Sequence, residues 1–201
     1  MRGREGTQDV THVNGFGVLS LQAESFWNIA ASLWGYYYGE LARLGSTAIA
    51  ASQLTGYPAG VWTIHGSPVN HNFPCVSMMD WRRNGSDTAR TWSLQMTIDV
   101  LGNDEKKMFA AEVSAPAAPA SPWPLKSTVY SIGFERADGK RVVLLSNTNS
   151  SATTATLRGA SGATIHTVDA SAGVGTTPYR TAKLASDVIE LAPSAFSLVE
   201  L

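Results

Sequence analysis

The chain has 201 residues, of which 44% are hydrophobic and 15% are charged, and its formal net charge is -1 at pH 7. This apolar content is sufficient for a buried core, and the length suits one large domain or two small ones. The charge balance argues against a nucleic-acid partner, because binding to phosphates requires a basic surface. No apolar run approaches the ~20 residues that a membrane-spanning helix needs.

The sequence says little about the cellular compartment. Cys75 is the single cysteine, so it makes no disulfide within the chain and is expected to be a small buried apolar residue. Residues 1–6 lead into polar sequence without the apolar segment of a signal peptide. An extracellular or secreted parent protein is compatible with this start, so the localisation stays open, as does the oligomeric state.

The first half of the chain predicts a long helix. Val18–Leu21 suggests a short extended piece, Ser25 is the expected N-cap, and a helix is expected over residues 26–44 with Gly45 as its stop. Its polar positions fall at steps of three and four residues and trace one narrow stripe: Asn28, Ser32, Gly35, Gly39 and Arg43. Because nearly every other position is apolar, we expect this helix to be packed on most sides.

Three further elements are expected before residue 102. Residues 47–54 are short and nearly continuously apolar, which favours a strand covered on both faces, as in a parallel sheet. After a loop rich in Gly, Pro, Asn and His, residues 75–79 predict a second extended segment. Ser86 or Asp87 is then expected to cap a helix that Gly102 ends. Helix, strand, long loop and helix in this order are typical of the last units of a (β/α)₈ barrel.

The second half of the chain has the period of two that indicates strands. A Pro/Ala-rich run over residues 115–124 interrupts the pattern, and Ala137–Lys140 is a hairpin-turn signal. Strands are expected at residues 108–113, 129–135, 141–147, 153–157, 164–168, 181–184, 188–191 and 196–201. Their spacing fits an antiparallel β-sandwich. We therefore predict an incomplete α/β barrel over residues 1–105 and a β-sandwich domain over residues 106–201.

Several segments resemble parts of retaining glycosidases that join a (β/α)₈ barrel to a β-sandwich. This group includes heparanase-like β-glucuronidases, β-xylosidases and α-L-arabinofuranosidases. Residues 36–45 resemble their seventh barrel helix, residues 49–57 their eighth strand, and residues 77–81 with 89–94 the approach to their eighth helix. Residues 138–147 resemble a sandwich hairpin of these enzymes, and residues 191–199 resemble their closing strand.

The resemblance implies a fragment of a glycoside hydrolase that is inactive by itself. Retaining glycosidases need an acid/base and a nucleophile, two carboxylates about 5–5.5 Å apart. In these families the pair lies at the ends of the fourth and seventh barrel strands, and this chain begins at or after the seventh. Glu5 is the one acidic residue loosely placed for the nucleophile, and no apolar strand precedes it. We therefore assign no catalytic residue.

The substrate-facing rim of the barrel is the remaining candidate site. Residues at and beyond the carboxyl end of a barrel strand line the active site, and sugars bind aromatic rings together with amide and hydroxyl groups. Gln53 and Tyr57 are in that position, and Trp81 joins them if the second extended segment is close. Tyr57 and Trp81 can equally be packing residues. The long loop adds two further candidates for substrate binding, Trp62 and His65.

The sequence shows no motif for a cofactor or a metal. His65 and His71 lack a third ligand with the usual spacing, so we expect no metal site, and no phosphate-binding glycine motif is present. The expected partner is a carbohydrate substrate. The alternative is a non-catalytic, carbohydrate-binding or accessory β-sandwich protein with a helical extension. A reading frame that continues upstream as barrel sequence would distinguish the first interpretation from the second.

Overall fold

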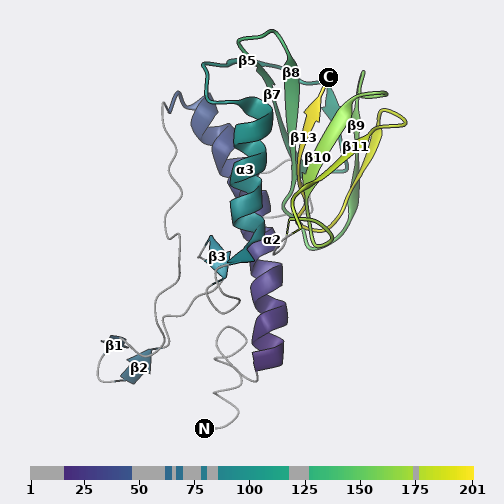
Figure 1. The fold of residues 1–201 in the computed structure, drawn as a ribbon. Helices are drawn as coiled ribbons and strands as arrows, with labels where there is room; N and C mark the ends of the chain where they lie inside the picture. Colours follow the sequence, from purple (N-terminus) through teal and green to yellow (C-terminus); the bar gives the residue numbers. More distant parts are fainter. Residues whose placement is uncertain are drawn as a thin grey trace.

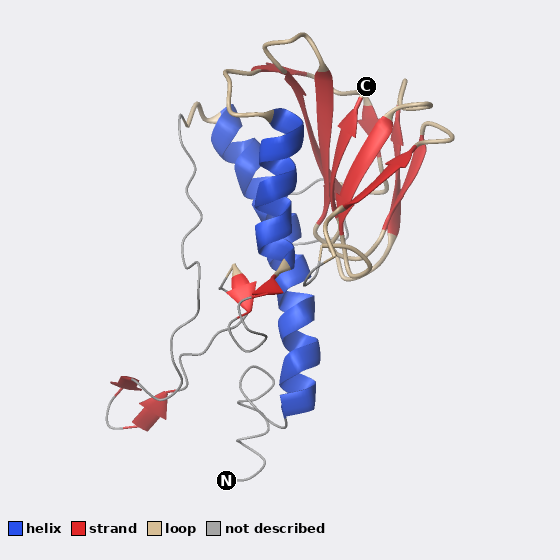
Figure 2. Cartoon of the chain, viewed as in Figure 1, coloured by secondary structure: helices blue, strands red, loops and turns tan. Residues whose placement is uncertain are grey.

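The computed structural model describes residues 16–46, 62–64, 67–69, 78–80, 86–117, 127–173 and 177–201, with the side chains of the first helix described from Trp27 onward. Two helices lie side by side and cover one face of an antiparallel sheet, and a smaller sheet covers the opposite face (Figure 1, Figure 2). The expected strand over residues 47–54 lies outside the described residues. Every strand pair among the described residues is antiparallel, so a barrel remnant is not established.

Helix α2 (Phe16–Arg43) begins ten residues before the predicted start. The predictions of an extended piece at Val18–Leu21 and of an N-cap at Ser25 are therefore wrong. The intervening residues Leu21, Gln22, Ala23 and Glu24 are good helix formers, so the helix continues through Ser25 without a break. The C-terminal stop is confirmed: Gly45 has φ +79°, and the N–H groups of Gly45 and Ser46 donate to the carbonyls of Ala42 and Leu41.

The stripe of small and polar residues on α2 faces the large sheet. A Cβ built on Gly35 would lie 2.5 Å from a ring carbon of Phe196, and one built on Gly39 would lie 2.5 Å from the hydroxyl oxygen of Tyr130. Asn28 and Ser32 on the same stripe are buried. The helix thus approaches the sheet through its small residues.

Helix α3 (Ala89–Leu101) follows a two-stranded ribbon of β3 (Met79–Asp80) and β4 (Ser86–Asp87). The predicted caps are wrong, because Ser86 and Asp87 form β4 and Thr88 is the N-cap. The Thr88 hydroxyl donates to the carbonyl of Met78 at 2.6 Å. Gly102 ends the helix with φ +70°, as expected, and α3 packs along α2. A separate hairpin pairs β1 (Trp62–Ile64) with β2 (Ser67–Val69).

The strands of the second half form two facing sheets. The larger sheet has the order β11 (Arg180–Lys183), β10 (Thr164–Val168), β13 (Phe196–Glu200), β8 (Arg141–Asn147), β7 (Val129–Glu135) and β5 (Lys107–Phe109). The smaller has the order β12 (Val188–Leu191), β9 (Thr153–Leu157) and β6 (Val113–Ser114). The predicted strands at 129–135, 141–147, 153–157, 164–168 and 188–191 are confirmed, and so is the hairpin turn, where Gly139 has φ +82°. The strand predicted at 181–184 lies one residue earlier, as β11, and the strand predicted at 196–201 ends one residue earlier, as β13.

The predicted strand over residues 108–113 is wrong, because the chain crosses there from one sheet to the other. β5 pairs with β7 in the large sheet, whereas β6 pairs with β9 in the small one. The three residues between them, Ala110–Glu112, turn the corner between the sheets. An alternating pattern of residues does not distinguish one continuous strand from two short strands on different sheets.

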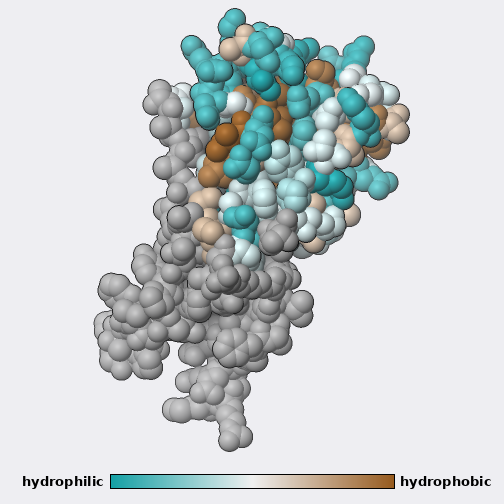
Figure 3. Space-filling model, in the orientation of Figure 1, coloured by the Kyte–Doolittle hydropathy of each residue, from teal (hydrophilic) through white to brown (hydrophobic). Residues whose placement is uncertain are grey.

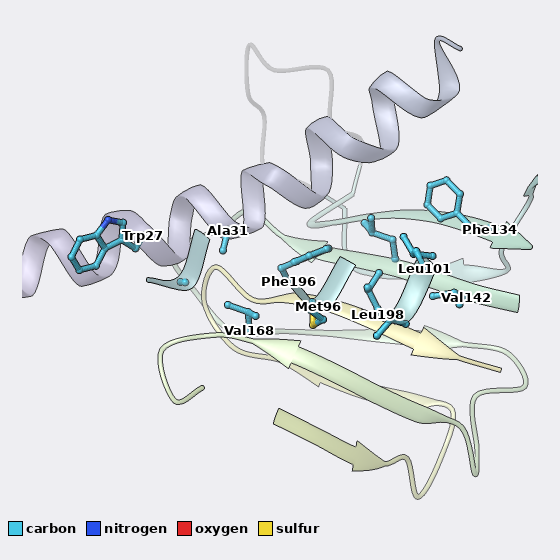
Figure 4. Packing of buried hydrophobic residues seen from close by; sticks show 12 residues of the cluster. Trp27, Ala31, Met96, Leu101, Phe134, Val142, Val168, Phe196 and Leu198 are labelled. Carbon is cyan, nitrogen blue, oxygen red and sulfur yellow. The ribbon is translucent and has the colours of Figure 1, made fainter. Parts of the chain in front are cut away.

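Two hydrophobic clusters lie on opposite faces of the large sheet. The cluster on the helix side joins Trp27 and Ala31 of α2 and Met96 and Leu101 of α3 to buried side chains of four strands (Figure 4). Those strand residues are Phe134, Val142, Leu144, Val168, Phe196 and Leu198. The second cluster, between the two sheets, includes Val143, Leu145, Leu157 and Ile189. The helices and the sandwich therefore share the central sheet as a common layer.

We predict that Gly35→Ala destabilises the protein. In an exposed helix interior this change stabilises by ~0.5–1 kcal/mol, because glycine is the poorer helix former. At Gly35 the added methyl group would overlap Phe196, which is fully buried, so we expect a net loss of ~1–3 kcal/mol in the free energy of unfolding. Urea denaturation followed by circular dichroism measures it.

Phe196→Leu provides the control for this prediction. Leucine lacks Cε2 and the rigid ring plane, and its Cδ methyl groups can rotate away from the new methyl group, so the double variant should lose less stability than the sum of the two single variants. A Gly35→Ala variant more stable than the original chain would contradict the close approach of α2 to β13.

Candidate functional site

The residues expected to bind substrate are not brought together by the described part of the structure. Gln53, Tyr57, His65 and Trp81 lie outside the described residues. Trp62 begins strand β1, whose backbone alone is described. The side-chain clusters that the structure does describe lie elsewhere, along the two helices and the large sheet.

The candidate site in the described residues is a groove of about 790 Å³ at the C-terminal ends of the two helices. The groove walls come from the last turns of α2, the second half of α3, the loop over residues 102–106, and strands β5 and β7. Its volume lies within the range of small-molecule sites. Figure 3 shows hydrophobic surface over the upper part of α3, bordered by hydrophilic residues.

Aromatic side chains form the inner wall of this groove. Trp34 and Tyr38 lie one turn apart on α2 with ring centroids 6.1 Å apart, and Tyr38 meets Phe134 edge-on at 5.7 Å. The Trp34 indole N–H donates to the Thr97 hydroxyl at 3.3 Å, and that hydroxyl donates to the Ser93 carbonyl at 2.7 Å. These contacts fix the Trp34 ring against α3. Burial raises the pKa of Tyr38, so its hydroxyl is neutral at physiological pH.

The outer rim of the groove is polar and rich in hydrogen-bond acceptors. Asn103, Asp104 and Glu105 are exposed there, immediately after the glycine that ends α3. The Lys106 ammonium donates to the Asp104 carbonyl at 2.6 Å, and burial lowers the pKa of Lys106. The one lysine of the rim is therefore already bonded within the loop, which leaves a carboxamide and two carboxylates facing solvent.

Two tyrosine–carboxylate hydrogen bonds connect the helices to the large sheet. Tyr130 of β7 donates to Glu40 of α2 at 3.0 Å, and Glu40 also forms an ion pair with Arg43 at 2.7 Å. Tyr179 donates to Asp99 of α3 at 2.8 Å. The pKa of Tyr179 is raised to about 12, mainly by burial and secondly by the hydrogen bond to Asp99. Arg43 and then Tyr130 hold the pKa of Glu40 below its usual value.

A polar network lies beside Tyr179 on the helix side of the sheet. His166 of β10 makes hydrogen bonds to Glu200 at 2.8 Å and to Thr181 at 3.0 Å, one through each ring nitrogen. The order Thr–His–Glu resembles a catalytic triad, but both contacts run across neighbouring strands of a regular sheet, and the groove at the helix ends does not include these residues. We interpret the network as structural.

Sequence reasoning did not identify the groove, although its members were visible. Trp34 and Tyr38 fall within the helix expected over residues 26–44, and residues 103–106 lie at the expected boundary between barrel and sandwich. The signal was the four-residue spacing of two large aromatic side chains near a helix end. What the sequence does not contain is the long-range pairing of β5 with β7, which closes the groove.

Comparison with known proteins includes a distant structural neighbour. No family model matches the chain, and no curated protein matches it. Among solved structures, a GH30 endoxylanase from Clostridium papyrosolvens superimposes with a TM-score of 0.35 and 16% sequence identity. The match covers 58% of this chain and 28% of the enzyme, so the chain spans less than a third of that enzyme's length. A superposition at this level assigns neither a fold nor a function.

Within the ranges that the structure describes, no group of three or more His, Cys, Asp or Glu side chains is placed to hold a metal ion. Of the helices described, neither α2 nor α3 combines the length and apolarity needed to cross a membrane.

We predict that Glu40 makes stability depend on pH in the acid range. Its pKa is lowered on folding, so its contribution is fully present above the unfolded value of about 4.5 and is lost as pH falls through the lower folded value. Glu40→Gln should therefore reduce stability near neutral pH by no more than about 1 kcal/mol, since solvent reaches the carboxylate. The difference should shrink below pH 4.5.

Urea midpoints measured for both proteins between pH 3 and 7 test this prediction. Glu190→Gln is the matched control, because Glu190 is exposed on β12. A difference between Glu40→Gln and the original chain that grows toward low pH would contradict the assignment.

Proposed function

We propose that this chain is the C-terminal part of a retaining glycoside hydrolase and is inactive by itself. In this proposal α2 and α3 belong to the outer helix layer of a (β/α)₈ barrel over residues 1–105, and the β-sandwich over residues 106–201 is seated on them. The support from sequence is the set of segments that resemble these enzymes. The support from structure is the pattern of surfaces on α2.

The observation that carries the proposal is that α2 has apolar surface on two sides. One side is covered by α3 and the large sheet. On another side Ile29, Leu33 and Tyr37, which recur every four residues, keep 39%, 37% and 55% of their surface exposed. A helix that is hydrophobic beyond one face is expected to lie between two packing partners. The outer helices of a (β/α)₈ barrel also lie between two packing partners.

A buried carboxylate in the described part of the chain makes structural contacts. Asp169 is the one buried carboxylate in the described ranges. Its oxygens accept hydrogen bonds from Arg180 and from the backbone and side chain of Ser171, so it holds a loop closed. Retaining hydrolysis needs a second carboxylate about 5–5.5 Å away, and this one is committed to structural contacts.

In the complete enzyme we assign Gln53, Tyr57, Trp81, Trp62 and His65 to the substrate-facing rim. Gln53 is the strongest of these candidates. A long amide within an apolar strand costs free energy unless it is hydrogen-bonded, and a sugar hydroxyl can supply that partner.

The first test is the reading frame upstream of the codon for Met1. The proposal expects it to continue as alternating strand and helix sequence with an Asn-Glu pair at the end of a strand. A promoter and start site immediately before Met1, with no barrel sequence upstream, would instead favour a non-catalytic carbohydrate-binding or accessory protein.

We predict that the purified chain has no glycosidase activity. A panel of aryl β-glycosides and aryl α-L-arabinofuranosides should show no turnover above the rate without protein. The reason is that the segments that resemble these enzymes correspond to their seventh barrel helix and later elements, whereas their acid/base lies at the end of the fourth strand. Turnover that Glu5→Gln abolishes would overturn the proposal and make Glu5 the nucleophile.

We predict that Gln53→Ala impairs catalysis in the complete enzyme more than it impairs folding. The loss in kcat/KM should correspond to ~1–3 kcal/mol of transition-state binding, the cost of one lost or unpaired polar contact. Steady-state kinetics and thermal unfolding of the same variant separate the two effects. A stability loss that accounts for the whole change in activity would make Gln53 a structural residue.

A further inference from the structure

We propose that the groove at the C-terminal ends of α2 and α3 binds a neutral oligosaccharide, independently of any active site in the barrel. The choice of carbohydrate as the ligand class rests on the proposed function. The location and the chemistry of the site rest on the groove itself. The proposal assigns a binding role to residues 34–46 and 94–108, none of which belongs to the expected catalytic rim.

The shape of the groove suits a short sugar chain. Its volume of about 790 Å³ lies in the upper part of the range of pockets that bury most of a drug-sized molecule. Its rim carries apolar side chains that already face solvent, with Ile98 39% and Met108 46% exposed. Burying such side chains under a ligand gives a favourable free energy that they lack in the free protein.

The inner wall offers aromatic rings to the apolar C–H faces of a sugar. Trp34 and Tyr38 are held rigidly, the first by its bond to Thr97 and the second by its edge contact with Phe134. Rigid aromatic side chains lose little conformational entropy on binding. The Tyr38 hydroxyl is a neutral donor on a side chain that lines the groove, and it suits a ligand hydroxyl.

The charge of the rim selects against anions. Asp104 and Glu105 are acceptors for sugar hydroxyls and repel phosphates and carboxylates. The Lys106 ammonium, which would otherwise attract an anion, is partly buried and donates to the Asp104 carbonyl. The side-chain amide of Asn103 adds a donor and an acceptor. Acceptors on the rim and aromatic faces on the wall together match a neutral, hydroxyl-rich ligand.

The experiment is a titration of the isotope-labelled chain, followed by the NMR signal of the Trp34 indole N–H. Trp34→Phe assigns that signal among those of the six tryptophans. The probes are xylotetraose, cellotetraose and arabinotetraose, with inorganic phosphate and tetralysine as the anionic and cationic comparisons. We expect at least one oligosaccharide to shift the Trp34 signal saturably at millimolar concentration, and phosphate to leave it unchanged.

Variants of the exposed rim test whether the oligosaccharide binds in this groove. The triple variant Asn103→Ala, Asp104→Ala and Glu105→Ala should weaken the oligosaccharide about tenfold or more, equivalent to ~1.4 kcal/mol. Met108→Trp, which fills the groove from an exposed position, should block it. Glu190→Ala is the matched control outside the groove and should bind normally. Unchanged urea midpoints confirm that each variant is folded.

The outcomes separate this proposal from the proposed function. No saturable shift with any oligosaccharide overturns the groove site, whereas the upstream reading frame still decides whether a barrel is encoded. Stronger binding of tetralysine than of every sugar overturns it in favour of a cation site. Sugar binding that both groove variants leave intact also overturns it, because the sugar then binds elsewhere on the chain.

Discussion

The close approach of α2 to the large sheet is the constraint on which the rest of the structure depends. Gly35 and Gly39 leave no room for a Cβ beside Phe196 and Tyr130, and between them the helix and the sheet are in direct contact. One turn earlier the Ser146 hydroxyl donates to the Ser32 carbonyl at 2.6 Å, a hydrogen bond that also requires this short separation. A helix with larger side chains on this stripe would lie farther out and leave Phe196 and Leu198 uncovered.

This contact makes the central sheet a layer that is buried on both faces. Val142, Val143, Leu144 and Leu145 of β8 are all fully buried, with alternate residues in the helix-side cluster and in the sandwich cluster. A solvated sandwich face would have shown polar residues at every second position of this strand. The continuous apolar run therefore belongs with the helices, and removing the helices would expose the even-numbered half of it to water.

The strands were predictable from the sequence because their signals are local. The alternation at 129–135, the Asp-Gly turn and the return strand at 141–147 lie within twenty residues of one another, and the structure pairs them in register from Val129 with Asn147 to Glu135 with Arg141.

The start of α2 was not predictable from Ser25, because a good capping residue inside a run of helix formers does not end a helix. The stripe of Asn28, Ser32, Gly35 and Gly39 was found, but its role was not. Small residues are found both on solvent-exposed helix faces and at close helix–sheet contacts. Which of the two applies here depends on sheet residues more than ninety positions away in the sequence.

The candidate groove owes its shape both to apolar burial and to directional hydrogen bonds. Apolar burial holds the helices on the sheet but is not directional, so it fixes neither their rotation nor their register. The two tyrosine–carboxylate bonds supply direction: Tyr130 holds α2 at Glu40 and Tyr179 holds α3 at Asp99, each within the C-terminal part of its helix. The groove is lined by the same C-terminal parts of both helices and by the loop after Gly102. Its aromatic wall is therefore carried by helix turns that directional hydrogen bonds orient, and a preformed site of this kind binds with a smaller cost of ordering its own side chains.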